Sequence, residues 1–114
     1  MCTVSFYRDS SRVVITSNRD EHIDRPLALP PQKNKYNSSI LYYPIDPLAG
    51  GTWFAVDANA NVLVLLNGAD AKHTPEPPYR CSRGIILLEL ISAPDVEQAW
   101  HSIDLDKIEP FTLI

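Results

Sequence analysis

Two segments near the start of the chain carry the pattern of paired strands. Residues 3–7 and 12–16 are rich in β-branched and aromatic side chains, and Asp9-Ser10-Ser11 between them is typical of a turn. The pattern predicts an antiparallel hairpin. Because the second strand of a hairpin ends level with the start of the first, we expect residues 18–21 to lie beside Cys2.

The next stretch is dominated by proline. Residues 25–47 contain five prolines among several polar side chains, a composition that argues against a central strand. We therefore expect a long surface excursion here, with one short strand at residues 40–43.

Regular structure is expected to resume at residue 52. Residues 52–56 and 62–66, joined by a turn of Asp, Ala and Asn residues, predict a second hairpin. The second of these runs is continuously apolar, which indicates a strand that is buried on both faces.

The last third of the chain begins with helical spacing. After a proline-rich loop at residues 74–78, apolar side chains form a wide face over residues 82–91, which predicts a helix. Ser92 followed by Asp95 resembles a capping box, so a second helix is expected over residues 95–103. Residues 111–114 read as a further strand. The predicted class is α+β, with antiparallel sheets and helices on one side.

Composition indicates the class of protein and excludes some kinds of partner. A chain of 114 residues, with 45% hydrophobic and 21% charged side chains, predicts a single globular domain over residues 1–114. Ten basic residues against fourteen acidic ones give no electrostatic footprint for a phosphate backbone, so nucleic acid is not an expected partner. The apolar runs are far shorter than the ~20 residues of a membrane span, and no signal peptide is evident. We expect a cytoplasmic protein with no transmembrane segment.

Cys2 is the strongest chemical candidate. If Met1 is removed, one residue holds a thiol nucleophile and a free α-amine, whose pKa near ~8 lets it serve as a local general base. The alternative is that Cys2 is a small buried hydrophobe, the commoner role of a lone cysteine. With Cys81 it makes no disulfide framework and no metal-binding spacing.

The segment Asn18-Arg19-Asp20-Glu21 gathers an amide, a guanidinium and two carboxylates at a strand end. Arg19 could hold a substrate carboxylate or steady a thiolate, and Asp20 could orient the α-amine or take part in proton transfer. The alternative is an exposed ion pair of little energetic value. Asp20, Glu21, His22 and Asp24 could suggest a metal site, but side chains at such neighbouring positions do not converge without a special turn, so no metal site is expected. No cofactor is expected either.

Three further positions could serve a site. Gly51, before Thr52-Trp53, allows close backbone approach or presents an amide donor, although a tight turn with Trp53 in the core explains it equally well. Asn67 is either a turn residue or a donor to an oxyanion. Arg83, near Arg80 at the start of a helix, could meet an anion. His73 and His101 are expected at the surface.

Taken together, these motifs resemble the NRDE family, also called the transport and Golgi organisation 2 family. The resemblance rests on Met1-Cys2, Asn18 to Glu21, Arg25-Pro26, Gly50 to Trp53, Leu66-Asn67 and Arg83-Gly84, in this order. The family is similar in outline to the N-terminal nucleophile (Ntn) hydrolases, whose fold is an αββα sandwich. Its proteins are well over twice this length, so residues 1–114 would be the N-terminal part of such a sandwich.

The resemblance also implies roles for single residues. Cys2 would be nucleophile and base, Arg19 and Asp20 its pocket partners, and Asn67 the oxyanion donor of an amidohydrolase acting on a C–N amide bond. Asn18, Gly51, Trp53 and Arg83 would bind the substrate. The alternative from another class is a non-catalytic carrier or trafficking factor for a haem-like or lipid anion. A homo-oligomer formed through an unpaired strand edge, or an inert fragment, stays open.

Overall fold

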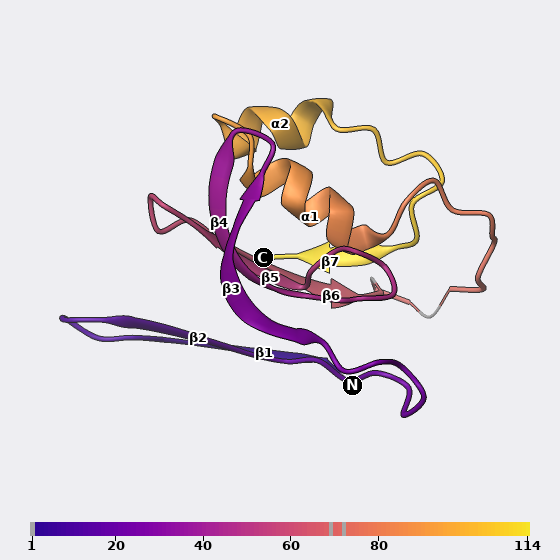
Figure 1. Cartoon of the computed structure of the whole chain (residues 1–114), viewed down its shortest axis with the longest axis horizontal. Helices are drawn as coiled ribbons and strands as arrows, with labels where there is room; N and C mark the ends of the chain where they lie inside the picture. Colours follow the sequence, from indigo (N-terminus) through magenta and orange to yellow (C-terminus); the bar gives the residue numbers. More distant parts are fainter. Residues whose placement is uncertain (1, 69, 72) are drawn as a thin grey trace.

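The computed structural model describes residues 2–68, 70–71 and 73–114. They form three layers (Figure 1): helices α1 and α2 lie on one face of a five-stranded sheet, and a two-stranded hairpin lies on the other face. The larger sheet has the order β3-β4-β5-β6-β7, and all its neighbouring strands are antiparallel. The predicted α+β class is confirmed, and the layering is compatible with part of an αββα sandwich.

The first hairpin forms where the sequence predicts it. Strands β1 (Thr3–Arg8) and β2 (Val13–Asn18) pair from Thr3 with Asn18 to Arg8 with Val13. The turn is closed by Asp9, whose Oδ1 accepts the backbone N–H groups of Ser11 and Arg12 at 2.8 and 3.0 Å. The register therefore returns the end of β2 to the level of Cys2.

The expectation of a surface excursion over residues 25–47 is wrong. Strands β3 (Leu29–Tyr36) and β4 (Ser39–Ile45) form a long hairpin, and Leu41 of β4 is fully buried in the core. Two of the prolines fall in β3, an edge strand, where the register shifts between Leu29 and Gln32. An edge strand tolerates residues that lack an N–H donor, so proline does not exclude β3. In β4, Pro44 lies beyond Leu41 and Tyr42, the residues that pair with β5.

The second hairpin is confirmed. Strands β5 (Phe54–Asp57) and β6 (Val62–Asn67) pair with each other, and β6 pairs on its other side with β7 (Phe111–Leu113). Val64 and Leu65 are adjacent in β6, so they point to opposite faces of the sheet, and both are buried. The predicted two-sided burial holds at the centre of this strand.

Both helices form, with a different cap at the second. Helix α1 (Arg83–Ile91) packs Leu87, Leu88 and Ile91 against the sheet. Helix α2 (Val96–Ser102) starts at Asp95, whose carboxylate accepts the N–H of Gln98 at 2.9 Å. The predicted capping box is wrong, because Ser92 is the C-terminal cap of α1. None of the described helices is long and apolar enough to cross a membrane.

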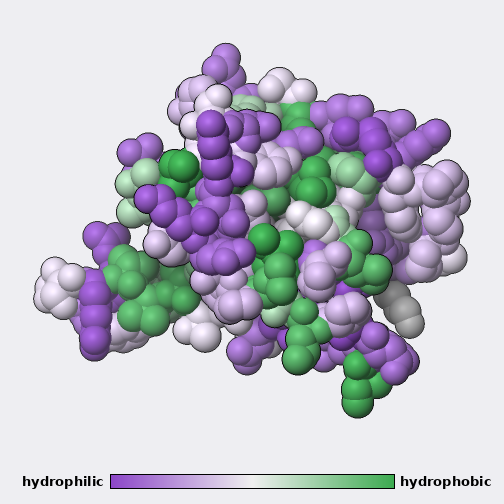
Figure 2. Space-filling view, in the orientation of Figure 1, coloured by the Kyte–Doolittle hydropathy of each residue, from purple (hydrophilic) through white to green (hydrophobic). Residues whose placement is uncertain are grey.

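The first hairpin stands apart from the larger sheet and is weakly covered. Figure 2 shows apolar side chains gathered over β1 and β2, where Phe6, Val13 and Val14 are exposed. An apolar groove of about 510 Å³, lined by Ile15 and Phe54 among others, separates the hairpin from the sheet. The hairpin that follows Cys2 is therefore poorly covered by the rest of the protein.

Candidate functional site

Cys2 lies beside the end of β2, as the hairpin predicts. Its Sγ accepts the backbone N–H of Asp20 at 3.5 Å and lies 3.7 Å from the carbonyl oxygen of the same residue, to which the thiol can donate. Asp20 therefore meets the sulfur through its backbone. The thiol is partly exposed, and Met1, whose removal would free the α-amine, lies outside the described residues.

A small hollow surrounds the thiol and opens toward several of the predicted residues. It is lined by Cys2, Ser17, Asn18, Arg19, Glu21, Trp53, Leu65 and Asn67. Five of these residues also line a larger cavity of about 480 Å³, namely Arg19, Glu21, Trp53, Leu65 and Asn67. The two spaces are neighbours, so a molecule in the cavity lies close to the hollow of Cys2.

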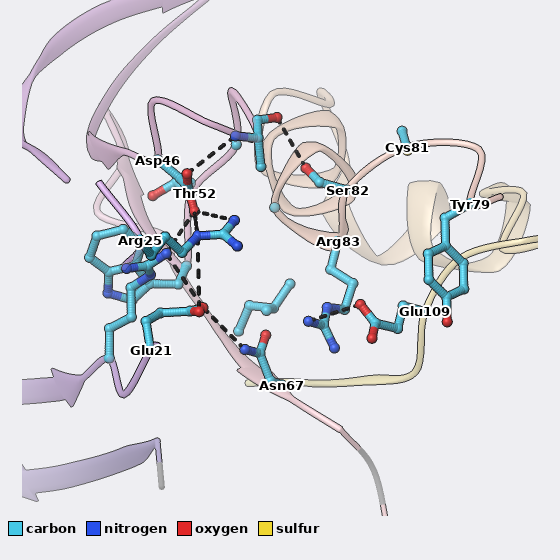
Figure 3. Close-up of a pocket in the computed structure, with 16 residues that line it drawn as sticks. Glu21, Arg25, Asp46, Thr52, Asn67, Tyr79, Cys81, Ser82, Arg83 and Glu109 are labelled. Atoms are coloured by element: carbon cyan, nitrogen blue, oxygen red, sulfur yellow. Dashed lines mark hydrogen bonds and ion pairs between the residues drawn. The ribbon is translucent and has the colours of Figure 1, made fainter. Parts of the chain in front are cut away.

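Two groups of charged side chains face each other across this cavity (Figure 3). Arg25, Glu21 and Asp46 lie on one side, and Arg83 with Glu109 on the other. Asn67, at the end of β6, lies between the two groups. The predicted residues Gly51, Trp53 and Arg83 all line the same cavity.

Asp46 is the hub of the first group. Its Oδ2 accepts Arg19 Nη2 at 2.6 Å and Arg25 Nε and Nη2 at 3.0 and 2.8 Å, while its Oδ1 accepts the N–H groups of Leu48 and Ala49. Burial raises the pKa of this carboxyl, but hydrogen bonds from Arg25 and from the two amides outweigh it and leave the pKa below its ordinary value. Asp46 thus stays ionised and holds both arginines.

Arg19 is fixed from three sides. Its guanidinium binds Asp46, lies 3.4 Å from Glu21 Oε1, and sits 4.7 Å from the centre of the Trp53 ring. An arginine over an aromatic face gains cation–π attraction, more so when it is partly shielded from water. The positive charge of Arg19 is therefore held at the border between the cavity and the hollow of Cys2.

Asn67 offers a side-chain donor at the same border. Its Nδ2 lies 3.4 Å from Glu21 Oε1 as a long hydrogen bond. An amide donor so placed can turn from a carboxylate to the oxyanion of a bound substrate.

The far wall of the cavity is an ion-pair network. Glu109 accepts Arg83 Nη2 at 3.0 Å through one oxygen and lies 3.1 Å from His73 Nε2 through the other. Arg83 also donates to the carbonyl of Pro110 at 3.1 Å. The neighbouring Arg80 donates instead to the main-chain carbonyls of Asp104 and Asp106.

Gly51 owes its place to close packing. A Cβ on Gly51 would lie 2.6 Å from the carbonyl carbon of Gly84, so the loop before β5 and the start of α1 touch through their backbones. Of the two interpretations, close approach is the one that the contacts support. This contact brings Arg83 of α1 to the cavity.

Residue patterns gave no role to Asp46, Glu109 or His73, although the structure brings Asp46 and Glu109 to the cavity and places His73 against Glu109. Asp46 follows a strand that proline concealed, and Glu109 lies in a short segment before β7. The one available signal for Asp46 was turn chemistry, because Asp46-Pro47 leads into Gly50-Gly51 within a few residues. Among the described residues, no group of three His, Cys, Asp or Glu side chains is arranged to hold a metal ion.

The family comparison matches residues 1–114 to the family described as "Transport and Golgi organisation 2". The chain belongs to this family. The recognition made from the motifs is confirmed. No curated protein and no solved structure matches the chain.

In this member of the transport and Golgi organisation 2 family, the four residues Asn18 to Glu21 make different contacts around Cys2. Asn18 and Arg19 line the hollow of Cys2, Asp20 meets the sulfur through its backbone, and Glu21 lies between Arg19 and Asn67. The motif thus surrounds the thiol with one cation, one amide, one carboxylate and backbone groups.

Proposed function

We propose that this chain is an Ntn-type amidohydrolase of the transport and Golgi organisation 2 family, with Cys2 as nucleophile once Met1 is removed. The observation that carries the proposal is the position of Cys2 in a hollow that shares Arg19 and Asn67 with a cavity of about 480 Å³. A nucleophile, a cation and an amide donor beside space for a ligand are the parts that acyl transfer requires.

In the proposed reaction the α-amine of Cys2 takes the thiol proton as the sulfur attacks the amide carbonyl carbon. The tetrahedral oxyanion accepts a hydrogen bond from Asn67 Nδ2. The C–N bond then breaks, and the ammonium returns its proton to the leaving amine. Water, deprotonated by the same amine, attacks the thioester and releases a carboxylic acid with the regenerated thiol. The net reaction is an amide and water giving an acid and an amine.

Substrate placement is assigned to the cavity side of the hollow. Trp53 supplies an apolar part of the lining, Gly51 and Arg83 line the same cavity, and Asn18 borders the thiol. Arg19 is proposed to stabilise the thiolate, because a fixed cation favours the charged form of a thiol. Asp20 is proposed to keep the α-amine oriented.

We also propose that residues 1–114 are the N-terminal part of a longer αββα sandwich. The support is the thin layer formed by β1 and β2. A lone two-stranded sheet is marginal, and here it leaves Phe6 and Val13 exposed beside an apolar groove. Further strands beside this hairpin would cover that surface.

Mass spectrometry tests the enzyme proposal directly. Intact mass gives the fraction of protein that has lost Met1, and incubation with a panel of N-acyl amides is expected to add one acyl mass to Cys2. Cys2→Ala is expected to abolish the adduct and Cys81→Ala to keep it. Asn67→Ala is expected to slow acylation roughly 10²–10³-fold, the usual effect of losing an oxyanion donor.

A carrier of an organic anion is the second candidate. The observation in its favour is that three arginines, Arg19, Arg25 and Arg83, line one cavity, where each is paired with a carboxylate that an anionic ligand would compete with. For a carrier, processed protein would form no adduct and hydrolyse no amide, and Cys2→Ala would bind haem or a lipid anion as tightly as the unchanged protein. That combination would sink the enzyme proposal.

A further inference from the structure

We propose that Asp46 is the positioning residue of the site and holds the Arg19 guanidinium over Trp53, at the border of the hollow around Cys2. The inference rests on the proposed function only in treating Arg19 as a site residue. It adds that the place of Arg19 is decided by a carboxylate 27 positions away in the chain.

The first support is the difference between the two carboxylates that face Arg19. Asp46 Oδ2 lies 2.6 Å from Arg19 Nη2, whereas Glu21 Oε1 lies 3.4 Å from the same nitrogen. Asp46 is 7% exposed as a residue. A short, charge-assisted hydrogen bond shielded from water is stronger than a long one in a wetter place. Asp46 is therefore the partner that fixes the guanidinium.

The second support is that the carboxylate itself cannot turn freely. Its Oδ1 accepts the N–H groups of Leu48 and Ala49 at 3.0 and 3.2 Å, which leaves Oδ2 for the two arginines. The loop that supplies these amides is closed by Gly50 N–H to the Asp46 carbonyl at 2.8 Å and by Asp46 N–H to the Gly51 carbonyl at 2.9 Å. The direction of Oδ2 is thus set by the backbone.

The third support is that this loop is anchored to the opposite wall of the cavity. Gly51 packs on Gly84 of α1, and Ser82 Oγ donates to the Ala49 carbonyl at 3.4 Å. Asp46 therefore connects the segment that carries Arg19 and Arg25 to the start of the helix that carries Arg83. Preorganised side chains of this kind are what a binding or catalytic site needs from the residues behind it.

The indole of Trp53 reports the position of Arg19 without any substrate. The chain has two tryptophans, so Trp100→Phe gives a background in which Trp53 is the only indole. In that background the ¹H–¹⁵N resonance of the Trp53 indole is measured for Arg19→Gln, Asp46→Asn and the double variant. Asp46→Glu keeps the charge but moves the carboxylate. Asp24→Asn is the control, because Asp24 is an exposed carboxyl in the loop that carries Arg25.

We expect Asp46→Asn and Asp46→Glu to move the indole resonance most of the way to its position in Arg19→Gln. In the Arg19→Gln background, Asp46→Asn should add less than about a fifth of its own shift, because residues that act through one another are not additive. Asp24→Asn should leave the resonance unchanged.

Three results would overturn the inference. Equal shifts in both backgrounds would mean that Asp46 acts without Arg19. A lower melting temperature with an unmoved indole, or loss of folding in both Asp46 variants, would assign Asp46 to the fold alone. The indole resonance is measured without any substrate, so it does not depend on turnover. A failure of the Cys2 adduct experiment can therefore be distinguished from a failure of this one.

Discussion

Gly51 and Gly84 touch through their backbones, although 33 positions separate them, and a Cβ on Gly84 would lie 2.6 Å from both the nitrogen and the oxygen of Thr52. The contact joins the loop after β4 to the first turn of α1. Because backbone atoms line both sides, a methyl group cannot be accommodated by the rotation of a side chain. The position of Arg83 in the cavity depends on this contact.

Gly84→Ala is therefore expected to lower the free energy of unfolding by about 1–3 kcal/mol or more, as overpacking does in a well-packed interior. Urea denaturation followed by circular dichroism measures the loss. Gly50→Asn is the control, because Gly50 has a positive φ of 70° and nothing within 4 Å of a Cβ. Asparagine tolerates that conformation, so the control should lose well under about 1 kcal/mol. An unchanged stability in Gly84→Ala would contradict the packing argument.

Asp46 is expected to contribute to acid unfolding. Its pKa is held below the ordinary 3.8 by Arg25 and two amides in spite of burial. A lowered folded-state pKa gives stability that is present above the unfolded value and is lost as the pH falls through the folded one. In Asp46→Asn, unfolding below about pH 4 should take up as much as one proton fewer than in the unchanged protein. The free energy of unfolding should therefore fall less steeply as the pH is lowered. The measurement is the free energy of unfolding from pH 2 to 6 in both proteins. The same dependence on pH in the two would contradict the prediction.

Cys81 is expected to be a poor nucleophile in the folded protein. Burial raises the pKa of its thiol above the ordinary 9.0; the charge of Arg80 opposes that effect and that of Glu89 adds to it. In Cys2→Ala protein, alkylation by iodoacetamide at pH 8 should be at least about threefold slower than in the same protein unfolded in urea, since the thiolate is the reactive form. The rate should rise as the pH passes 9. Equal rates in the two states would refute the burial effect.

The N-terminal caps of the two helices are expected to differ in how much they stabilise the protein. Asp95 accepts the N–H of Gln98, whereas Ser82, the N-cap of α1, makes no side-chain cap bond. Asp95→Ala should cost about 1 kcal/mol of stability, the usual worth of a cap. Ser82→Ala should cost less, because Ser82 Oγ loses only its long bond to the Ala49 carbonyl at 3.4 Å. Thermal unfolding of the two variants compares them, and a larger loss in Ser82→Ala would reverse the assignment.

Much of the fold follows from local patterns. The two hairpins at residues 3–18 and 54–67 and both helices were predictable, because each depends on periodicity and turn chemistry within about twenty residues. The β3–β4 hairpin was not, because proline argues against a strand and whether the strand is at an edge is a property of the whole sheet. The wrong expectation there also hid Asp46.

At the site, the neighbourhood of Cys2 follows from the residue pattern alone, because hairpin register is a local matter: Thr3 pairs with Asn18 once the turn at Asp9 forms. The sequence also determined the family, through short motifs in a fixed order. The contacts of those motifs depend on the packing of distant segments. Asp46, Asn67 and Glu109 reach the cavity through sheet order and through the packing of the β4–β5 loop on α1, and such contacts between distant segments leave no local periodicity to read.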